Sequence, residues 1–198
     1  MKVGLLLAAG QGSRFGGDKC LAPLADGTPL VLQAARNLQG AVDHLVVIAR
    51  PGDSALQQLM RDQGFTVVAC DKAHLGMAES LKCGVAATPS ASGWLIAFAD
   101  MPFIQPASYQ AVADSLSSDD SLCVPFCQDK QGHPVGFGCG YRQLLLALQG
   151  DVGARSILKQ YPDKIQRLTL DDAGIVWDID RPEDLQQANK QLSNDQKG

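Results

Sequence analysis

Blocks of apolar and polar positions follow one another along the chain and predict strands and helices in turn. Residues 2–8 form a continuous apolar run, typical of a strand that is buried on both faces of a parallel sheet. Similar runs predict further strands at 42–49, 65–70, 93–99, 122–126, 165–170 and 175–179. The stretches between them predict helices at 29–38, 53–63, 76–87, 106–116, 142–148, 154–160 and 182–192.

This alternation predicts an α/β fold in three layers, with a mostly parallel central sheet and helices on both faces. The segment 128–140 is an exception, because its second half predicts a strand that can run antiparallel to the others. The chain shows no internal repeat and no linker. We therefore expect one domain over residues 1–192, followed by a polar tail at 193–198.

The first strand opens into a loop that is rich in glycine and carries two cations. The loop contains Gly10, Gly12, Gly16 and Gly17, together with Arg14 and Lys19. Glycine lets a ligand approach the backbone closely, and successive N–H groups with cationic side chains form a site for anions. The alternative is a tight strand-to-helix turn with solvated charges. The interleaving of glycines with cations favours a polyphosphate site.

Two common nucleotide motifs do not fit this loop. The P-loop requires Gly-Lys followed by Ser or Thr, and no such triplet occurs in the chain. The dinucleotide fingerprint requires a third glycine where Phe15 stands, and an acidic residue where the second strand is followed by Arg50. A dehydrogenase with that fingerprint is therefore disfavoured.

Acidic residues lie where two expected strands end. Asp100 directly follows an apolar run, and the carboxyl ends of parallel strands open into one crevice. Mg²⁺ bound to phosphates usually takes one or two carboxylates, so Asp100 is a candidate ligand, with a turn cap as the alternative. Asp178 and Asp180 would share one face of the last expected strand. Asp180 equally suits a helix start before Pro182; if it converges with Asp100, the two residues bracket a metal.

Two polar turns in the second half of the chain carry further candidates. Gly132-His133-Pro134 holds one of three histidines, and a lone His in a turn is more often structural or solvated than catalytic. The stretch 150–155 combines a glycine-flanked turn, a helix start and an Arg, which suits a second anion site. The alternative for this stretch is a capped helix start with a surface Arg.

Composition narrows the classes of partner and compartment. The chain has 198 residues, a net charge of -4 and no run of Lys or Arg, so we expect no nucleic-acid partner. No apolar run is long enough to cross a membrane, and no leader pattern precedes the first strand. We therefore expect a cytoplasmic protein without a membrane partner.

The six cysteines form no C-x-x-C pair. The only grouping in the sequence that resembles a metal site is Cys123 and Cys127 with His133. On a strand, residues four apart lie about 13 Å from each other, too far to share one zinc ion. All six are expected to be free thiols, mostly in the core.

Six stretches of the chain form a recognisable set. They are Leu7-Ala8-Ala9-Gly10-x-Gly12-x-Arg14-Phe15-Gly16-Gly17-x-Lys19, Gly76-Met77-Ala78-Glu79-Ser80-Leu81, Asp100-Met101-Pro102, Gly132-His133-Pro134-Val135, Gly150-Asp151-Val152-Gly153-Ala154-Arg155 and 178–185. Together they resemble molybdenum cofactor cytidylyltransferases, within the superfamily of MobA-like nucleoside-triphosphate transferases. The first stretch marks the superfamily, and its combination with the stretches at 132–135 and 150–155 marks the molybdopterin branch.

The resemblance implies a Rossmann-like nucleotidyltransferase fold and a Mg²⁺-dependent reaction. That reaction joins CMP from CTP to molybdopterin, the organic part of the molybdenum cofactor, and releases pyrophosphate. It also implies transient contact with a molybdoenzyme or its chaperone. The resemblance extends over essentially the whole chain.

Carried over by position, the resemblance assigns roles to individual residues. The nucleotide would be bound by Leu7, Ala8, Ala9, Gly10, Gly12, Ser13, Arg14, Lys19, Ser80 and Asp100. The catalytic residues would be Arg14, Lys19 and Asp100, and the metal would be held by Asp100 and Asp180. The acceptor side would be formed by His133, Asp151, Gly153, Ala154 and Arg155.

Several alternatives stay open at this stage. Ala9 indicates CTP, because guanylyltransferase relatives typically have Ala-Gly-Gly where this chain has Ala8-Ala9-Gly10. GTP, or a sugar or polyol phosphate acceptor, would nevertheless use the same chemistry. A non-catalytic cofactor carrier or maturation chaperone would keep the fold without turnover, and an NADP-dependent oxidoreductase would bind a different cofactor.

Overall fold

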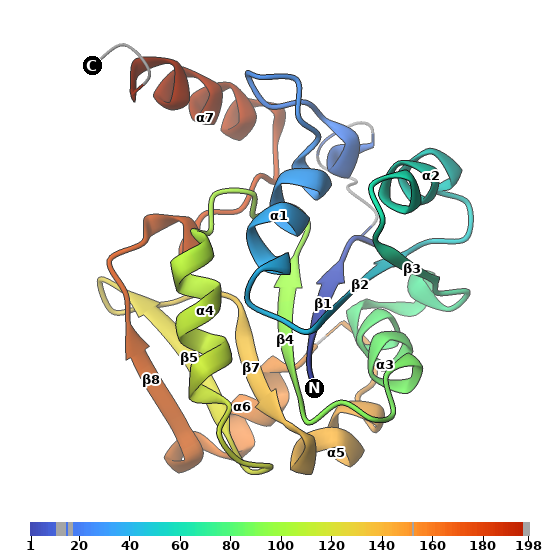
Figure 1. Cartoon of the computed structure of the whole chain (residues 1–198), viewed down its shortest axis with the longest axis vertical. Helices are drawn as coiled ribbons and strands as arrows, with labels where there is room; N and C mark the ends of the chain where they lie inside the picture. Colours follow the sequence, from blue (N-terminus) through green and yellow to red (C-terminus); the bar gives the residue numbers. More distant parts are fainter. Residues whose placement is uncertain (11–14, 16–17, 152, 196–198) are drawn as a thin grey trace.

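The computed structural model describes residues 1–10, 15, 18–151 and 153–195, and strands alternate with helices along them (Figure 1). The strands are β1 (Lys2–Leu7), β2 (His44–Ala49), β3 (Thr66–Ala69), β4 (Gly93–Phe98), β5 (Leu122–Cys127), β6 (Lys130–Gln131), β7 (Val135–Gly138) and β8 (Ile165–Thr169). The α-helices are α1 (Leu30–Gln39), α2 (Ser54–Asp62), α3 (Met77–Ala87), α4 (Pro106–Ser115), α5 (Arg142–Leu146), α6 (Arg155–Gln160) and α7 (Pro182–Asp195). Short 3-10 helices lie at η1 (Lys19–Leu21), η2 (Ala73–Leu75), η3 (Cys139–Tyr141), η4 (Pro162–Lys164) and η5 (Ala173–Val176).

The described strands form an eight-stranded sheet in the order β3-β2-β1-β4-β7-β5-β6, with β8 paired to β5. β1 pairs in parallel with β2 and β4, β2 with β3, and β5 with β8. β7 runs antiparallel to β4 and β5, and β6 runs antiparallel to β5. The expected α/β fold with a mostly parallel sheet is confirmed, and the strand in the second half of 128–140 is antiparallel.

Helices cover both faces of the sheet. Side chains of α1, α2 and α4 pack against Leu6 and Leu95, whereas side chains of α3, α5 and α6 pack against Leu5 and Ile96. Neighbouring strand residues point to opposite faces, so the continuous apolar runs of β1 and β4 serve both layers at once. Figure 1 shows α1 and α4 crossing the near face of the sheet.

Residues 175–179 do not form the strand that their apolar character predicts. Instead, Ala173–Val176 is the short 3-10 helix η5, and none of the described residues from 171 to 181 belongs to the sheet. Asp178 and Asp180 therefore do not share the face of a strand, and that prediction is wrong.

A buried carboxylate explains this turn of the chain. Asp172 accepts a hydrogen bond from the N–H of Gly174 at 2.9 Å. It also reaches the start of α4, where it accepts from the Ser108 hydroxyl at 2.6 Å and from the Gln105 N–H at 2.9 Å. Pairing three donors with one buried group outweighs the strand preference of the apolar residues that follow.

The last helix, α7, lies beyond the sheet, beside the segment that precedes α1 (Figure 1). It begins at Pro182 and continues to Asp195, past the predicted end at residue 192. Leu24, Leu30, Ile179 and Ala188 form a separate buried cluster that joins α7 to the body of the protein. Within the described ranges, no helix has the length and apolar character needed to span a membrane.

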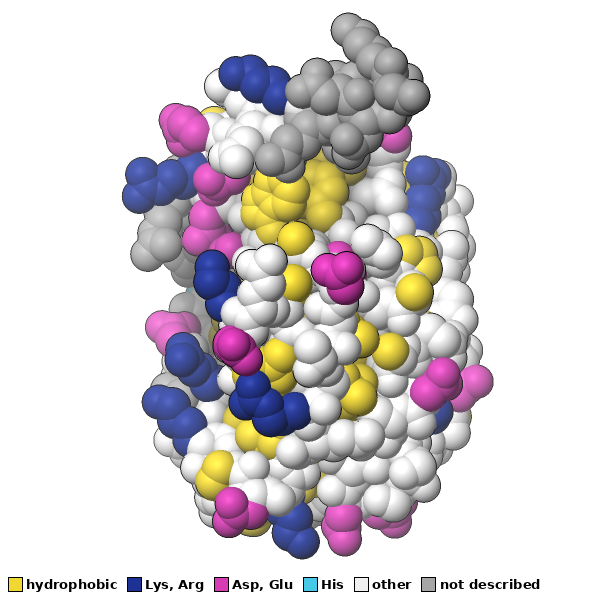
Figure 2. All heavy atoms as spheres, turned by 90° about the vertical axis from the view of Figure 1, so that its left-hand side faces the viewer, with side chains coloured by type: hydrophobic (Ala, Val, Ile, Leu, Met, Phe, Trp, Pro, Cys, Tyr) yellow, Lys and Arg dark blue, Asp and Glu magenta, His cyan; other side chains and the backbone are white. Residues whose placement is uncertain are grey.

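Charged side chains of both signs are interspersed on the face shown in Figure 2. Apolar side chains are exposed there in one patch near the top and in smaller areas below it. Among the coloured side chains, this face carries no continuous basic surface of the kind that nucleic acids bind.

Gly138→Ala is expected to destabilise the fold. A Cβ at this position, the end of β7, would lie 2.3 Å from the carbonyl oxygen of Asp119, so the backbone must shift. We expect the free energy of unfolding to fall by about 1–3 kcal/mol, measured by urea denaturation. Gly40→Ala is the control, because nothing lies within 4 Å of its Cβ position. Equal losses in the two variants would contradict the steric argument.

Candidate active site

The carboxyl ends of β1 and β4 lie side by side. Leu7 is in register with Phe98, and the N–H of Ala99 donates to the carbonyl oxygen of Leu7 at 3.1 Å. From these ends the chain continues into residues 8–10, which begin the glycine-rich loop, and into Asp100. The parallel arrangement thus opens both segments into one crevice.

Lys19 joins two of the predicted site acids, and we refer to Lys19, Asp100 and Asp180 as the ion cluster. The Nζ of Lys19 donates to Asp100 Oδ2 at 2.7 Å and to Asp180 Oδ1 at 3.0 Å, across 81 and 161 residues of sequence. The Lys19 side chain is 13% exposed, against 24% for Asp100 and 42% for Asp180. The cluster therefore lies where the interior meets solvent.

Backbone contacts hold Asp180 beside Asp100. The N–H of Ile179 donates to the carbonyl oxygen of Asp100 at 2.9 Å, and the side chain of Ile179 is fully buried. The N–H groups of Asp180 and Arg181 donate to Asp184 Oδ2 at 3.0 and 2.7 Å. Asp184 thus caps the start of α7, and the carboxylate of Asp180 serves the ion cluster.

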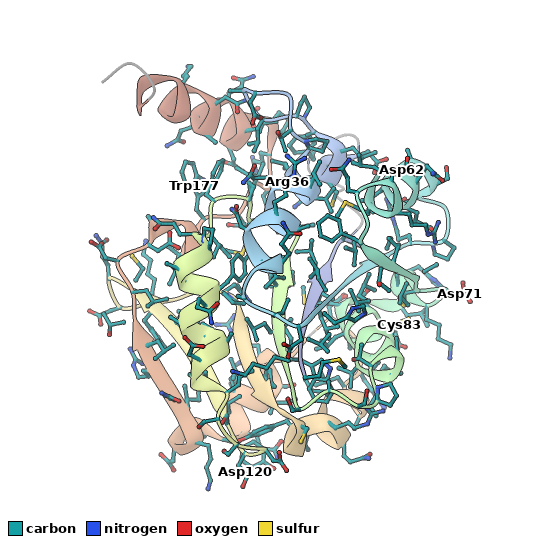
Figure 3. The ribbon with its side chains drawn as sticks, in the orientation of Figure 1. Arg36, Asp62, Asp71, Cys83, Asp120 and Trp177 are labelled. Atoms are coloured by element: carbon teal, nitrogen blue, oxygen red, sulfur yellow. The ribbon has the colours of Figure 1, made fainter. Side chains whose placement is uncertain are left out.

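An aromatic contact supports the same two segments. The rings of Phe103 and Trp177 lie 4.8 Å apart, and Trp177 lies beneath α7 (Figure 3). Phe103 follows Asp100 closely in the chain, and Trp177 precedes Asp180. The contact therefore helps to fix the backbone positions from which both carboxylates reach Lys19.

The electrostatics of the cluster keep the lysine charged. Burial acts to lower the pKa of Lys19, but the charge of Asp100 and hydrogen bonds to both carboxylates outweigh it, so the pKa is raised. Burial raises the pKa of Asp178, and the charges of Asp180 and Asp100 add to that effect. Burial, with the charge of Asp100, raises the pKa of Cys20 to about 12, so this neighbouring thiol is unreactive at neutral pH.

The donors of the ion cluster suit a hard divalent cation. Two carboxylate oxygens lie within 3.0 Å of one nitrogen atom, so one cation near that position can contact both. Mg²⁺ takes such oxygens, usually with waters and substrate phosphates as its other ligands. In the described part of the chain, no group of three or more His, Cys, Asp or Glu side chains surrounds a metal position. A metal here would rely on Asp100 and Asp180, and Lys19 would have to release them.

The first of three neighbouring cavities, which we call the loop cavity, has a volume of about 490 Å³. The predicted nucleotide-binding residues that line it are Leu7, Ala8, Ala9, Gly10, Lys19, Ser80 and Asp100. Gly12, Ser13 and Arg14 lie outside the described residues. The described residues of this predicted set therefore lie together at one cavity, and their binding of a nucleotide stays a prediction.

The second cavity, which we call the apolar cavity, has a volume of about 430 Å³. The predicted acceptor residues His133, Asp151, Gly153, Ala154 and Arg155 all line it. Much of the remaining wall is aliphatic and comes from Leu81, Ile96, Val135 and Leu158. The structure thus brings together two motifs that are well separated in the sequence.

The third cavity, which we call the acidic cavity, has a volume of about 480 Å³. Asp100, Asp178 and Asp180 line it, together with Lys130, Gln131 and His133. Met77 and Phe98 line all three cavities. The cavities therefore adjoin at these two side chains.

The loop cavity and the apolar cavity share a wall where α3 meets Gly150 and Asp151. The N–H of Ala78 donates to the carbonyl oxygen of Gly150 at 3.1 Å. A Cβ on Gly76, whose φ is 123°, would lie 2.6 Å from Asp151 Oδ1 and 2.7 Å from the Gly150 oxygen. Glycine at this position therefore permits a close approach between the two segments.

His133 is held as a neutral ring at the junction of the apolar and acidic cavities. Its ring meets Phe98 edge to face, with centroids 4.6 Å apart. Burial lowers the pKa of His133 to about 4, although a hydrogen bond with the backbone of Ile96 acts in the other direction. Among the described residues, the buried Nδ1 of His133 has no hydrogen-bond partner. This nitrogen is suited to bonding a ligand.

Met77, Phe98, Lys130 and Gln131 are among the lining residues that were not predicted as site residues. Met77 and Phe98 are apolar residues at element ends, and the sequence alone does not distinguish such positions from the core. Met77 is nevertheless 42% exposed in the structure. Lys130 and Gln131 directly precede Gly-His-Pro, and this adjacency is the only sequence signal that could have found them.

The sequence profile of the MobA-like NTP transferase domain matches residues 4–165. The chain belongs to this family. It is therefore a nucleotidyltransferase domain of the MobA-like type, which agrees with the superfamily that the motifs indicated.

Three named proteins are similar in sequence to this MobA-like chain. Nicotine blue oxidoreductase from Paenarthrobacter nicotinovorans is 29% identical over 193 residues, covering 92% of this chain and 94% of that protein. Purine catabolism protein PucB from Bacillus subtilis is 26% identical over 201 residues, covering 96% and 97%. A probable molybdenum cofactor guanylyltransferase from Thermococcus gammatolerans is 26% identical over 148 residues, covering 72% and 73%.

Among solved structures, Rv0371c from Mycobacterium tuberculosis is similar over nearly its whole length. It matches with a TM-score of 0.84 and 26% identity, covering 96% of this chain and 97% of that chain. A structure of Rv0371c in complex with manganese matches with a TM-score of 0.81 and 24% identity, with the same coverage. The structural similarity therefore covers more of the chain than the family match, which ends at residue 165.

His133→Asn is expected to make stability less sensitive to acid. The pKa of His133 is about 4 in the folded state against an ordinary 6.5, so the unfolded chain takes up this proton first as the pH falls. The free energy of unfolding therefore drops between pH 6.5 and 4, by up to about 3 kcal/mol from this group. Urea denaturation at pH 7 and 4.5 measures the drop. The same drop in wild type and variant would contradict burial of a neutral ring.

Proposed function

We propose that this chain is a molybdenum cofactor cytidylyltransferase. It joins CMP from CTP to molybdopterin in the cytoplasm and releases pyrophosphate, with Mg²⁺ as cofactor. The observation that supports this most is the position of the two predicted residue sets in adjoining cavities, with Leu7, Met77, Phe98 and Asp151 common to both. A transferase must hold two substrates in contact, and two cavities with a common wall suit that requirement.

In the proposed reaction, a phosphate oxygen of molybdopterin attacks the α-phosphorus of CTP in line. The new P–O bond forms as the bond to the β-phosphate oxygen breaks, and pyrophosphate leaves with its electron pair. The attacking oxygen is already anionic, so the chain need not supply a general base. Lys19 transfers its hydrogen bonds from carboxylates to phosphate oxygens and screens the repulsion between the two anions, a role that Arg14 shares.

Asp100 and Asp180 are the residues that would hold the metal. When bound, Mg²⁺ supplies electrostatic stabilisation for the charge on the reacting phosphates. The manganese complex of Rv0371c supports divalent metal use, because that protein shares the fold over nearly its whole length. The carboxylates of Asp100 and Asp180 both contact the Nζ of Lys19, which supports these two residues as the ligands of a metal here.

Ala9 supports CTP as the nucleotide. Its side chain is 4% exposed and lines the loop cavity, so its methyl group occupies space that glycine would leave open. Relatives that use GTP typically carry glycine there, which leaves more room beside the larger purine. The relative from Thermococcus gammatolerans is named a guanylyltransferase. Within the proposal, the choice of CTP over GTP rests on Ala9.

An oxidoreductase is the second candidate, because the relative from Paenarthrobacter nicotinovorans carries that name and matches 92% of this chain. Two observations disfavour it. Phe15 stands in place of the third glycine of the dinucleotide fingerprint. Arg50 follows β2 where an acid would bind the ribose, and its Nε donates to Asp53 at 2.8 Å.

The proposal is tested by measuring pyrophosphate release from CTP, Mg²⁺ and molybdopterin. We expect release that requires the acceptor and is faster with CTP than with GTP. Calorimetric competition that shows tighter binding of GTP would overturn the argument from Ala9. Binding of both substrates without release would indicate a carrier, and oxidation of NADPH without release would indicate an oxidoreductase.

Lys19→Met is expected to have opposite effects on turnover and on metal binding. Turnover should fall at least about a hundredfold, because a cation that acts on the leaving group is lost. Affinity for Mn²⁺ without nucleotide should rise about tenfold, because the ammonium no longer competes for Asp100 and Asp180. Electron paramagnetic resonance of free Mn²⁺ measures the second effect. Lys164→Met is an exposed control, and unchanged or weaker Mn²⁺ binding in Lys19→Met would refute the shared-ligand argument.

A further inference from the structure

We propose that Lys130 and Gln131, on the β5–β6 hairpin, hold the phosphate end of the acceptor in the acidic cavity. The acceptor's ring system then lies in the apolar cavity. This inference rests on the proposed function, because it takes the acceptor to be a phosphorylated pterin. It adds two binding residues to the set that the motifs indicated.

The hairpin that carries these residues is a tight two-residue turn. Its central residues, Gln128 and Asp129, have φ values of 47° and 63°. Two successive positive φ angles match the twist of a paired hairpin, but they are unfavourable for Gln in particular. Conformations of this kind persist where the surrounding structure determines them, and they gather at functional sites.

The base of the hairpin is fixed to the segment that precedes the site acids. The N–H of Gly132 donates to the carbonyl oxygen of Pro125, and the N–H of His133 donates to that of Ile175, both at 2.8 Å. A Cβ on Gly132 would lie 2.5 Å from the Ile175 oxygen, so the two segments are in close contact. Lys130 is thereby held at a defined place on the wall of the acidic cavity.

The positive charge of Lys130 offsets the negative charges that line the acidic cavity. Three carboxylates line the acidic cavity, and Lys130 is the one Lys or Arg among the described residues that line it. These carboxylates repel an entering phosphate, and in the proposed function Lys19 acts on the phosphates of the nucleotide, so the acceptor phosphate needs a further cation. Lys130 is exposed and makes no ion pair within the described ranges, so its ammonium is available to a phosphate.

Gln131 lies at the junction of the two cavities. It lines both the apolar cavity and the acidic cavity, as His133 does. Its amide both donates and accepts hydrogen bonds, which suits the link between a ring with heteroatoms and a phosphate. The aliphatic wall formed by Ile96, Val135 and Leu158 suits the flat faces of such a ring.

The position of Asp100 decides which cavity takes the phosphate. Asp100 lines the loop cavity and the acidic cavity but is not among the described residues that line the apolar cavity. An acceptor phosphate must lie beside the α-phosphate of the nucleotide and beside the ion cluster. The acidic cavity meets both conditions, and the hairpin closes that cavity with a positive charge.

The test compares two pterins that differ only by a phosphate. Fluorescence anisotropy measures binding of a pterin with a phosphate monoester on its side chain and of the same pterin with a free hydroxyl. Wild type should bind the phosphorylated pterin about tenfold more tightly. Lys130→Met should reduce this ratio to about one, Lys130→Arg should retain most of it, and Lys164→Met should leave it unchanged. Calorimetry with CTP shows whether each variant keeps the wild-type nucleotide affinity.

The arms of this experiment separate the possible failures. A phosphate-dependent ratio that persists in Lys130→Met would overturn the role of Lys130. If Arg155→Met loses the preference for the phosphorylated pterin and Lys130→Met keeps it, the phosphate lies in the apolar cavity. That result would overturn the inference in the same way. Wild type that binds CTP but neither pterin would overturn the proposed acceptor itself.

Discussion

The ammonium of Lys19, held between the carboxylates of Asp100 and Asp180, is the contact on which the site depends. It joins the start of η1, the end of β4 and the approach to α7, which are remote from one another in the sequence. Without a cation between them, the two carboxylates would repel each other across a partly buried gap. The same oxygens are the donors that a divalent metal requires. The cluster is therefore a structural contact and, in the proposed function, the place where a metal replaces the lysine.

The mixed sheet gives this cluster its surroundings. Parallel strands β1 and β4 end together and supply the loop cavity, whereas antiparallel β7 starts at this same edge and runs away from it, with His133 just before its start. The direction of β7 thus brings the Gly-His-Pro turn to the carboxyl ends of strands whose own loops bind the nucleotide in the proposed function. Residues that follow parallel strands and residues that precede an antiparallel strand thereby lie at one edge of the sheet.

The sequence predicted the strands and helices well where apolar runs were long and bounded by glycine or proline. It failed at 175–179, because Asp172 pairs with donors on η5 and α4 that local pattern does not reveal. Motifs indicated Lys19, Asp100 and Asp180, but not that the lysine would lie between the acids, since that depends on side-chain geometry. Phe98 could not be predicted, because an apolar residue at the rim of a cavity has no distinguishing pattern, and Met77 was marked only by its place in the stretch 76–81.

The hydrogen bond from Ala78 to Gly150 has a consequence for attempts to alter specificity. It joins the walls of the loop cavity and the apolar cavity, and in the proposed function α3 lies on the nucleotide side and Gly150 and Asp151 on the acceptor side. Grafting the turn of a relative onto this chain would also displace the helix start that lines the loop cavity. A change of acceptor therefore calls for exchanging the start of α3, with Gly76, together with the segment that begins at Gly150.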